Sequence, residues 1–227
     1  FQTTQHAKKS EKSIVHSRVS QKGENNAAVK IIDRNLEVLQ EVIDYSADLS
    51  PSLHIVVGCI ELNESVGKPY FNVAIVIAAG RIVGRYIKQL LPFYDVFDEL
   101  RYFEAGNELL VLEIAGSRVG FTICEDLWNI EGKELYPESP MEQLIMEKPD
   151  LMINIAASPF ALKQTENRAE VLKWNTKKYN LPVLYVNHVG AQTELIFDGG
   201  SCVYNQDGEV IEQLPFFEEY FSIFDKR

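Results

Sequence analysis

Hydrophobic residues recur along the chain with two different periods, which together predict a mixed α/β fold. Between residues 28 and 48 they return every three or four positions, with charged residues on the other faces, as in an amphipathic helix. Elsewhere the apolar runs are short, rich in β-branched residues and bounded by turn residues, which is typical of buried strands. These runs are 53–62, 71–88, 109–124, 150–158, 181–190 and 199–214.

Turn residues divide three of these runs into predicted hairpins. The predicted turns are Ala79-Gly80, Gly116-Ser117 and Asp207-Gly208. Further helices are predicted at 140–148 and 166–179. Hairpins combined with strand–helix–strand units predict sheets that pack against each other with helices outside. The segment "DGGS" at 198–201 is predicted to be a hairpin turn, because it lacks the Lys-Ser/Thr pair of a phosphate-binding loop.

The first 27 residues differ from the rest of the chain. They are rich in Ser, Thr, Gln and Asn and carry an excess of Lys and Arg, so we predict a polar basic arm ahead of one domain at 28–227. A chain of 227 residues is long enough for a single large α/β domain. The chain begins with Phe1 rather than Met, which leads us to expect that it is part of a longer gene product.

Charge and cysteine content narrow the choice of partners and compartment. The formal net charge of -11 disfavours nucleic acid and anionic membranes as main partners. No apolar stretch approaches the roughly 20 residues that a membrane span needs. The three cysteines are far apart and odd in number, which favours a reducing compartment and predicts a cytoplasmic protein. The four histidines are scattered, and no metal site is expected.

Two residues at the ends of predicted strands are candidates for chemistry. Cys124 ends an apolar run in "GFTICEDLW" (120–128) and is followed by two acids, which would disfavour its thiolate. Lys88 ends another run, and its ammonium could lower the pKa of a nearby thiol or stabilise an oxyanion. Spacing alone leaves the simpler alternatives open, namely a buried structural cysteine and a solvated surface lysine.

Four blocks of sequence carry a family pattern, namely "YFNVAIVIAAGRIVGRYIKQLLPFYDVFDELRYFEAG" (70–106), "GFTICEDLW" (120–128), "NIAASPF" (154–160) and "VNHVGAQTELIFDGGS" (187–201). They resemble the nitrilase, or carbon–nitrogen hydrolase, superfamily, and in particular the glutaminase domains of glutamine-dependent NAD synthetases. The resemblance extends in order over about residues 28–220. It implies an α-β-β-α sandwich that lacks the strands with which the family usually opens.

The resemblance also implies a mechanism. Cys124 would attack the carboxamide of glutamine to give a thioester and ammonia. Lys88 and the backbone N–H of Glu125 would stabilise the oxyanion, and Glu99 would orient Lys88. The residues implied to line the glutamine pocket are Tyr94, Phe97, Glu125, Ser158, Phe160 and Arg168.

Two parts of the family pattern are missing or out of register. The general base of the family is a glutamate in an N-terminal Pro-Glu motif, and this chain has no such motif. Glu11 and Glu24, the only glutamates before the first predicted helix, do not end apolar runs, so we assign the base to no residue. The family often has Gly-Lys after the "SPF" motif, where this chain has Leu162 and Lys163, and the register there is open.

Three functions follow as hypotheses. The chain could be the glutaminase portion of an NAD synthetase, a free-standing amidase for another small amide, or a catalytically inactive remnant that serves binding or assembly. The chain lacks the S-G-G-x-D-S loop of an ATP-pyrophosphatase domain, so no cofactor is expected in this domain. ATP and magnesium would belong to a synthetase domain on the same or another chain. Homo-oligomers are expected, because superfamily domains commonly pair. Without the base, the activity of this chain alone is expected to be weak or absent.

Overall fold

The computed structural model describes residues 27–225, which divide into two units at the boundary between Val42 and Ile43. The first described element is the helix α2 (Ala27–Ser46), which confirms the helix predicted from the apolar period. On its exposed surface Arg34 donates to Glu37 and Glu41 at 3.2 and 3.3 Å.

The predicted basic arm lies, except for its last residue, outside the described residues. Among those residues no helix has the length and apolar character that a membrane crossing requires.

The smaller sheet of the second unit is an antiparallel meander of three strands. It contains β1 (Ile55–Leu62), β2 (Tyr70–Ala78) and β3 (Arg81–Ile87), in that order. The central strand β2 is buried without interruption from Val73 to Ala78, as expected for its unbroken apolar run. The turn before β3 is formed by Ala79 and Gly80, both left-handed with φ of 49° and 74°, as the sequence predicts.

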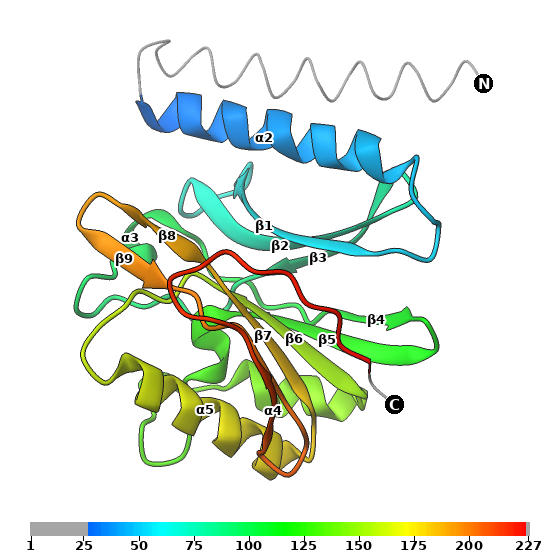
Figure 1. Ribbon diagram of the computed structural model, residues 1–227. Coiled ribbons are helices and arrows are strands. Elements are labelled where there is room, and N and C mark those ends of the chain that lie inside the picture. Colours follow the sequence, from blue (N-terminus) through cyan, green and yellow to red (C-terminus); the bar gives the residue numbers. More distant parts are fainter. Residues whose placement is uncertain (1–26, 226–227) are drawn as a thin grey trace. The chain divides into compact units, whose positions relative to one another are not determined.

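The larger sheet has six strands and carries the parallel part of the fold (Figure 1). Its order is β11-β10-β7-β6-β5-β4. The three central strands β5 (Ser117–Ile123), β6 (Leu151–Ala156) and β7 (Val183–Asn187) are parallel. The flanking strands β4 (Val111–Ile114), β10 (Cys202–Tyr204) and β11 (Val210–Gln213) are antiparallel to their neighbours. Because β5 to β7 are parallel, their carboxyl ends lie along one edge of the sheet.

The two faces of the larger sheet bury alternate residues of each strand. One face packs on the smaller sheet, through residues such as Val76 of β2 and Phe121 of β5. The other face is covered by α4 (Pro140–Leu144) and α5 (Gln164–Tyr179), with Met152, Leu144 and Leu172 in the shared core (Figure 1). Two packed sheets with helices outside confirm the predicted α/β layered class.

Three local predictions need correction. The hairpin turn between β4 and β5 is Ala115-Gly116, one residue earlier than predicted, because both residues are left-handed and β5 starts at Ser117. The run 181–190 is broken at His188 into β7 and β8 (Val189–Gln192). The helix predicted at 140–148 is α4 followed by a 3-10 turn at Ile145–Glu147.

The prediction of a hairpin turn at "DGGS" was wrong. The preceding strand β9 (Leu195–Asp198) pairs with β8, whereas the following strand β10 pairs with β7 and β11. The two glycines therefore connect different sheets. Gly199 and Gly200 are left-handed, with φ of 67° and 66°, and a β-carbon on either would collide with Val189 or Phe216.

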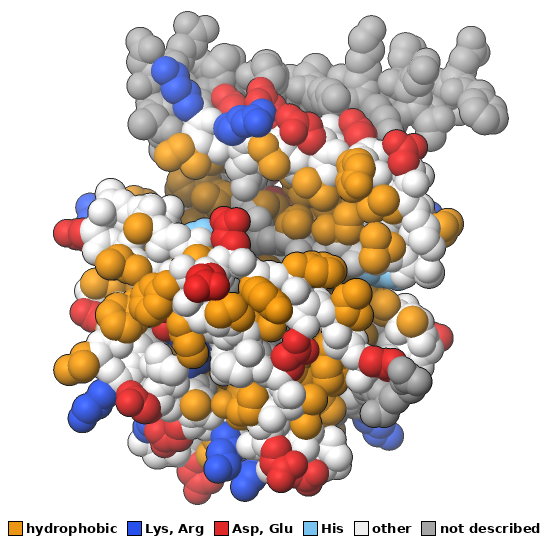
Figure 2. Space-filling model, viewed as in Figure 1, with side chains coloured by type: hydrophobic (Ala, Val, Ile, Leu, Met, Phe, Trp, Pro, Cys, Tyr) orange, Lys and Arg blue, Asp and Glu red, His pale blue; other side chains and the backbone are white. Residues whose placement is uncertain are grey.

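Exposed apolar side chains gather over the segment that follows β11 and the adjoining β8–β9 hairpin (Figure 2). The two segments are joined by the Phe217 N–H, which donates to the Asp198 carbonyl at 2.8 Å. The exposed apolar residues of this surface are Phe160, Ile196, Phe217, Tyr220, Phe221 and Ile223. Apolar surface of this kind is compatible with the predicted self-association, which stays a prediction.

Candidate active site

Two of the predicted site residues, Cys124 and Ser158, follow the carboxyl ends of parallel strands of the larger sheet, and Asn187, which was not predicted, lies at the same edge. Cys124 comes directly after β5, Ser158 two residues after β6, and Asn187 ends β7. In α/β sheets the loops at this edge are where ligands bind. The strand order therefore brings together residues that lie more than 60 positions apart in the sequence.

Cys124 lies at the tip of a sharp turn, where it packs against the edge of the core between the two sheets. The chain leaves β5 and enters a 3-10 turn, Cys124–Leu127, in which the following residues Glu125, Asp126 and Leu127 are buried. Cys124 itself is partly exposed, carries a free thiol and has a left-handed φ of 43°. This conformation is uncommon for a residue other than glycine and is a frequent feature of functional turns. The turn is compatible with a reactive cysteine, and that role of Cys124 stays a prediction.

The Lys88 ammonium is buried and held by the carboxylate of Glu99. Lys88 follows β3, and its side chain is only 2% exposed. Its Nζ donates to both carboxylate oxygens of Glu99, at 2.7 and 2.9 Å. Glu99 begins the short helix α3 (Glu99–Tyr102), and one of its oxygens also accepts from the Asn72 amide at 3.4 Å. The structure thus places Glu99 where the resemblance implies it, in contact with Lys88.

The Lys88 ammonium and the Cys124 thiol each shift the pKa of the other. Burial opposes the charge of Lys88, but the nearby Cys124 and Glu99 outweigh it, so the pKa of Lys88 is raised. Burial raises the pKa of Cys124 to about 11, and Lys88 is the main group that opposes this rise, while Glu125 adds to it. The thiol is therefore protonated at neutral pH, and the proton must be removed when the cysteine attacks.

Asp126 joins the two halves of the site, a role that the sequence analysis missed. One of its carboxylate oxygens accepts the backbone N–H groups of Gln89 and Leu90, at 3.1 and 2.8 Å. The other accepts the Tyr86 hydroxyl at 2.8 Å and the Ile123 N–H at 2.9 Å. Asp126 thereby ties the segment after Lys88 to the cysteine turn. Only its position two residues after a candidate nucleophile could have drawn attention to it.

Two tyrosine hydroxyls donate to the side-chain carboxylate of Glu125, a residue that is only 3% exposed. The hydroxyl of Tyr94 donates to its Oε1 at 2.7 Å, and the Tyr94 ring contacts Phe97 edge to face at 5.7 Å between ring centroids. A second hydroxyl, that of Tyr136, donates to the same oxygen at 3.1 Å. Burial raises the pKa of Glu125, and the two hydroxyls oppose that rise. Tyr136 was not predicted, because it lies in a loop without a recognisable motif.

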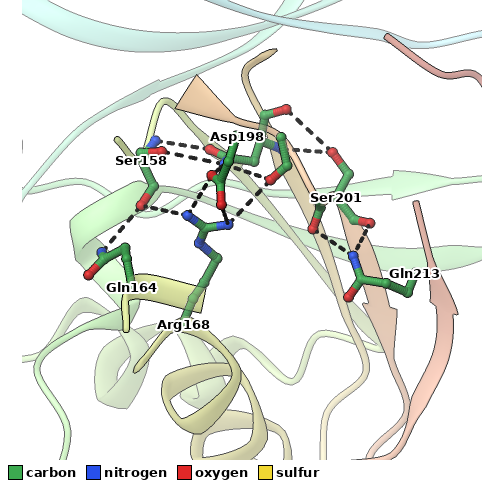
Figure 3. A network of polar contacts seen from close by, with 9 residues as sticks. Ser158, Gln164, Arg168, Asp198, Ser201 and Gln213 are labelled. Atoms are coloured by element: carbon green, nitrogen blue, oxygen red, sulfur yellow. Dashed lines mark hydrogen bonds and ion pairs between the residues drawn. The ribbon is translucent and has the colours of Figure 1, made fainter. Parts of the chain in front are cut away.

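Ser158 and Arg168 belong to a buried polar network beneath this edge of the sheet (Figure 3). The guanidinium of Arg168 pairs with the carboxylate of Asp198 at 2.9 Å and donates to the Ser158 hydroxyl at 3.4 Å. The Ser158 N–H donates to the Asn187 side chain at 2.9 Å. Arg168 is thus engaged by protein groups, and its predicted contact with substrate stays a prediction.

The segment after the "SPF" motif has a register that the sequence left open. Lys163 is left-handed, with φ of 66°, and directly precedes α5, so it occupies the kind of position that suits glycine. Gln164 follows it, and its amide lies 3.5 Å from the Ser158 hydroxyl. The structure therefore favours Lys163-Gln164, rather than Leu162-Lys163, as the counterpart of the family's Gly-Lys. Phe160 is 49% exposed, and its ring contacts that of Phe217 at 5.5 Å.

Comparison with known proteins agrees with the resemblance. The chain is 36% identical over 196 residues to the glutamine-dependent NAD(+) synthetase of Synechocystis. The matched region covers 83% of this chain and 35% of that protein. It is 38% identical over 192 residues to the enzyme of the same name from Thermotoga maritima, with 84% and 31% covered. The chain spans about a third of the length of these curated relatives.

A solved structure and a family profile complete the comparison. The glutamine-dependent NAD+ synthetase of Acinetobacter baumannii, solved in complex with ADP, superposes with a TM-score of 0.72 and 32% identity, covering 87% of this chain and 36% of that one. Residues 35–225 match the profile of the carbon-nitrogen hydrolase family. This range includes the cysteine turn, the lysine–glutamate pair and all three sheets of the described residues, and the chain therefore belongs to the carbon–nitrogen hydrolase family.

Proposed function

We propose that this chain is the glutaminase portion of a glutamine-dependent NAD synthetase, which hydrolyses glutamine to glutamate and ammonia. The observation that carries the proposal is the left-handed Cys124 at a strand end beside the buried Lys88–Glu99 ion pair. The names of the relatives support glutamine as the substrate. The ammonia would be used to amidate deamido-NAD in a synthetase domain, in the same or another chain, where ATP and magnesium would act.

The reaction would pass through a thioester. The Cys124 thiolate attacks the side-chain carboxamide carbon of glutamine, and the Lys88 ammonium with the Glu125 backbone N–H stabilises the oxyanion that forms. The C–N bond then breaks, and the proton that the Cys124 thiol gave up passes to the leaving nitrogen, which departs as ammonia. Water then attacks the thioester carbonyl and the C–S bond breaks, so that the hydroxyl of the water stays in the glutamate carboxyl group and its proton restores the thiol. Glu99 holds Lys88 in place throughout, through its two hydrogen bonds.

Glu125 offers a subsite for the amino end of the substrate. Its Oε1 accepts two tyrosine hydroxyls, whereas the described residues make no hydrogen bond to Oε2. A carboxylate oxygen that is not already hydrogen-bonded can accept a cationic ligand. We assign this oxygen to the α-ammonium group of glutamine.

The proton of Cys124 needs an acceptor, and we assign that role to none of the described residues. General-base catalysis typically contributes a factor of about 100 to 10,000 in rate, so the 227-residue chain should turn over slowly. An extended chain that adds an N-terminal strand ending in Pro-Glu should be faster by a factor in that range.

Ammonia release from glutamine by the two chains, each with and without Cys124→Ala, tests the proposal. We expect slow release by the chain itself, faster release by the extended chain, and none by either Cys124→Ala variant. A diazoketone analogue of glutamine should add one mass label, on Cys124. Turnover of a small aliphatic amide but not of glutamine would favour a free-standing amidase, and the absence of both turnover and labelling in the extended chain would favour a non-enzymatic remnant.

A further inference from the structure

The loop between the cysteine turn and α4 is closed on itself by a single side chain. The amide nitrogen of Asn129 donates to the carbonyls of Tyr136 and Glu138, at 3.0 and 3.1 Å. Its amide oxygen accepts the N–H groups of Leu135 and Tyr136, at 3.0 and 3.1 Å. Four hydrogen bonds to one side chain fix the shape of the loop 129–139, and they fix the backbone of Tyr136 in particular.

The same loop is anchored at a second point, on the helix α5. Lys133, near the middle of the loop, donates to the carboxylate of Glu170 at 2.6 Å. This ion pair is exposed, so it contributes little to stability, but it gives the loop a contact outside itself. A loop held at its base and at its middle can present a side chain in one orientation.

The side chain so presented is that of Tyr136, and it reaches the candidate active site. Its hydroxyl donates to Oε1 of Glu125 at 3.1 Å, next to the 2.7 Å hydrogen bond from Tyr94. The two tyrosines come from separate segments, one before α3 and one after the cysteine turn. Two donors that approach one oxygen from different segments restrict rotation of the carboxylate, which a single donor would leave free to turn.

We propose that Tyr136 is a positioning residue that, together with Tyr94, fixes the Glu125 carboxylate so that its Oε2 is presented to the cationic end of the substrate. The substrate contact rests on the proposed glutaminase function, whereas the clamp on Glu125 does not. Loss of the Tyr136 hydroxyl leaves Glu125 with one donor, a more mobile carboxylate and a less stable anion.

The charged and titratable groups around Glu125 all bear on this clamp. Besides the two tyrosines, Lys88 stabilises the Glu125 anion, whereas Glu99 opposes it. The adjacent Cys124 thiol is itself affected by the charge of Glu125. A variant that removes only the Tyr136 hydroxyl leaves these other groups unchanged, and it therefore isolates the contribution of the loop.

The test compares Tyr136→Phe with Tyr220→Phe, a control that removes an exposed hydroxyl far along the chain. The first measurement is an NMR titration of the Glu125 carboxyl with ¹³C-labelled glutamate, assigned with Glu125→Gln. Loss of a hydrogen bond to the anion should raise the titration midpoint by about one pH unit in Tyr136→Phe and leave it unchanged in the control. An unchanged midpoint in Tyr136→Phe would overturn the proposal, whether or not the protein turns over glutamine.

The second measurement is steady-state glutamine hydrolysis by the extended chain. Because the clamp acts on substrate binding, Tyr136→Phe should raise KM about tenfold and change kcat less than twofold. A fall in kcat at unchanged KM would contradict a positioning role for the binding of glutamine. If the unsubstituted extended chain has no glutaminase activity, the proposed function and the substrate contact both fail, while the titration still decides the clamp.

Discussion

The carboxylate of Asp126 accepts the backbone N–H of Leu90 at 2.8 Å and so fastens the chain after Lys88 to the turn that carries Cys124. The two segments come from different sheets, one following β3 and the other following β5. Asp126 thus links the segment after the lysine to the cysteine turn, although it is not itself a predicted substrate contact.

Replacement of Asp126 by Ala should destabilise the protein strongly. It leaves four donors without their acceptor, and each buried donor left unpaired costs about 1–3 kcal/mol. We expect the free energy of unfolding to fall by about 3 kcal/mol or more, as measured by urea denaturation. Asp48→Ala, at an exposed position, is the control and should change it by less than about 0.5 kcal/mol. Similar small effects of both variants would show that the Asp126 contacts are dispensable.

Replacement of Lys88 by Met should make Cys124 less reactive. The ammonium of Lys88 lowers the pKa of the thiol, so its removal raises that pKa further and reduces the thiolate fraction. One unit of pKa corresponds to a tenfold change in thiolate, and we expect iodoacetamide to label Cys124 about tenfold more slowly at pH 9. In the control variant Lys133→Met, which removes a surface ammonium, Cys124 should be labelled as fast as in the unsubstituted chain. Equal rates in both variants would place Lys88 outside the environment of the thiol.

The labelling of Cys124 in the unsubstituted chain should depend steeply on pH. Because its pKa is raised to about 11, the thiol is protonated at neutral pH, and the rate should rise about tenfold per unit up to that value. The pKa values of Cys59 and Cys202 are raised to about 12, mainly by burial, so both cysteines should be labelled more slowly than Cys124 at each pH. Mass spectrometry of peptides after short exposures at pH 8, 9 and 10 would follow the three sites separately. A rate for Cys124 that levels off below pH 9 would contradict the raised pKa.

The Arg168–Asp198 pair should behave as a buried ion pair whose two members depend on each other. Arg168→Met leaves a carboxylate that is 1% exposed without its cation, and removal of one buried partner typically costs about 3–5 kcal/mol. The double variant Arg168→Met/Asp198→Asn should recover part of that loss in a urea titration. Lys133→Ala breaks the exposed pair with Glu170 and should cost no more than about 1 kcal/mol. If Arg168→Met lowered the free energy of unfolding as little as Lys133→Ala does, the prediction would be contradicted, and the buried network would have to rearrange around the missing guanidinium.

The elements of the fold could be predicted from the sequence because their signals are local. The unbroken apolar run of β2 and the Ala79-Gly80 turn depend only on neighbouring residues, and both were predicted correctly. The connection at Gly199-Gly200 was predicted wrongly. Whether two glycines form a hairpin or lead into another sheet depends on the partners of the strands on either side, β9 and β10, and the local sequence does not specify those partners. Glycine pairs satisfy both geometries equally well.

The candidate site could be predicted only in part, for a similar reason. Motifs pointed to Cys124, Lys88 and Glu99, whose functional assignment stays a prediction although the structure places Glu99 on Lys88. The contacts of Asp126 with Tyr86 and of Tyr136 with Glu125 span 40 and 11 positions, and the local sequence does not reveal them.

The left-handed backbone at Cys124 sets two requirements against each other. A non-glycine residue in this conformation carries a cost of about 1–2 kcal/mol that glycine would not pay. The backbone conformation by itself would therefore favour glycine at position 124, whereas the proposed reaction requires the thiol of cysteine there. Under the proposed function, conformational stability and the nucleophile thus make opposite demands on the same position.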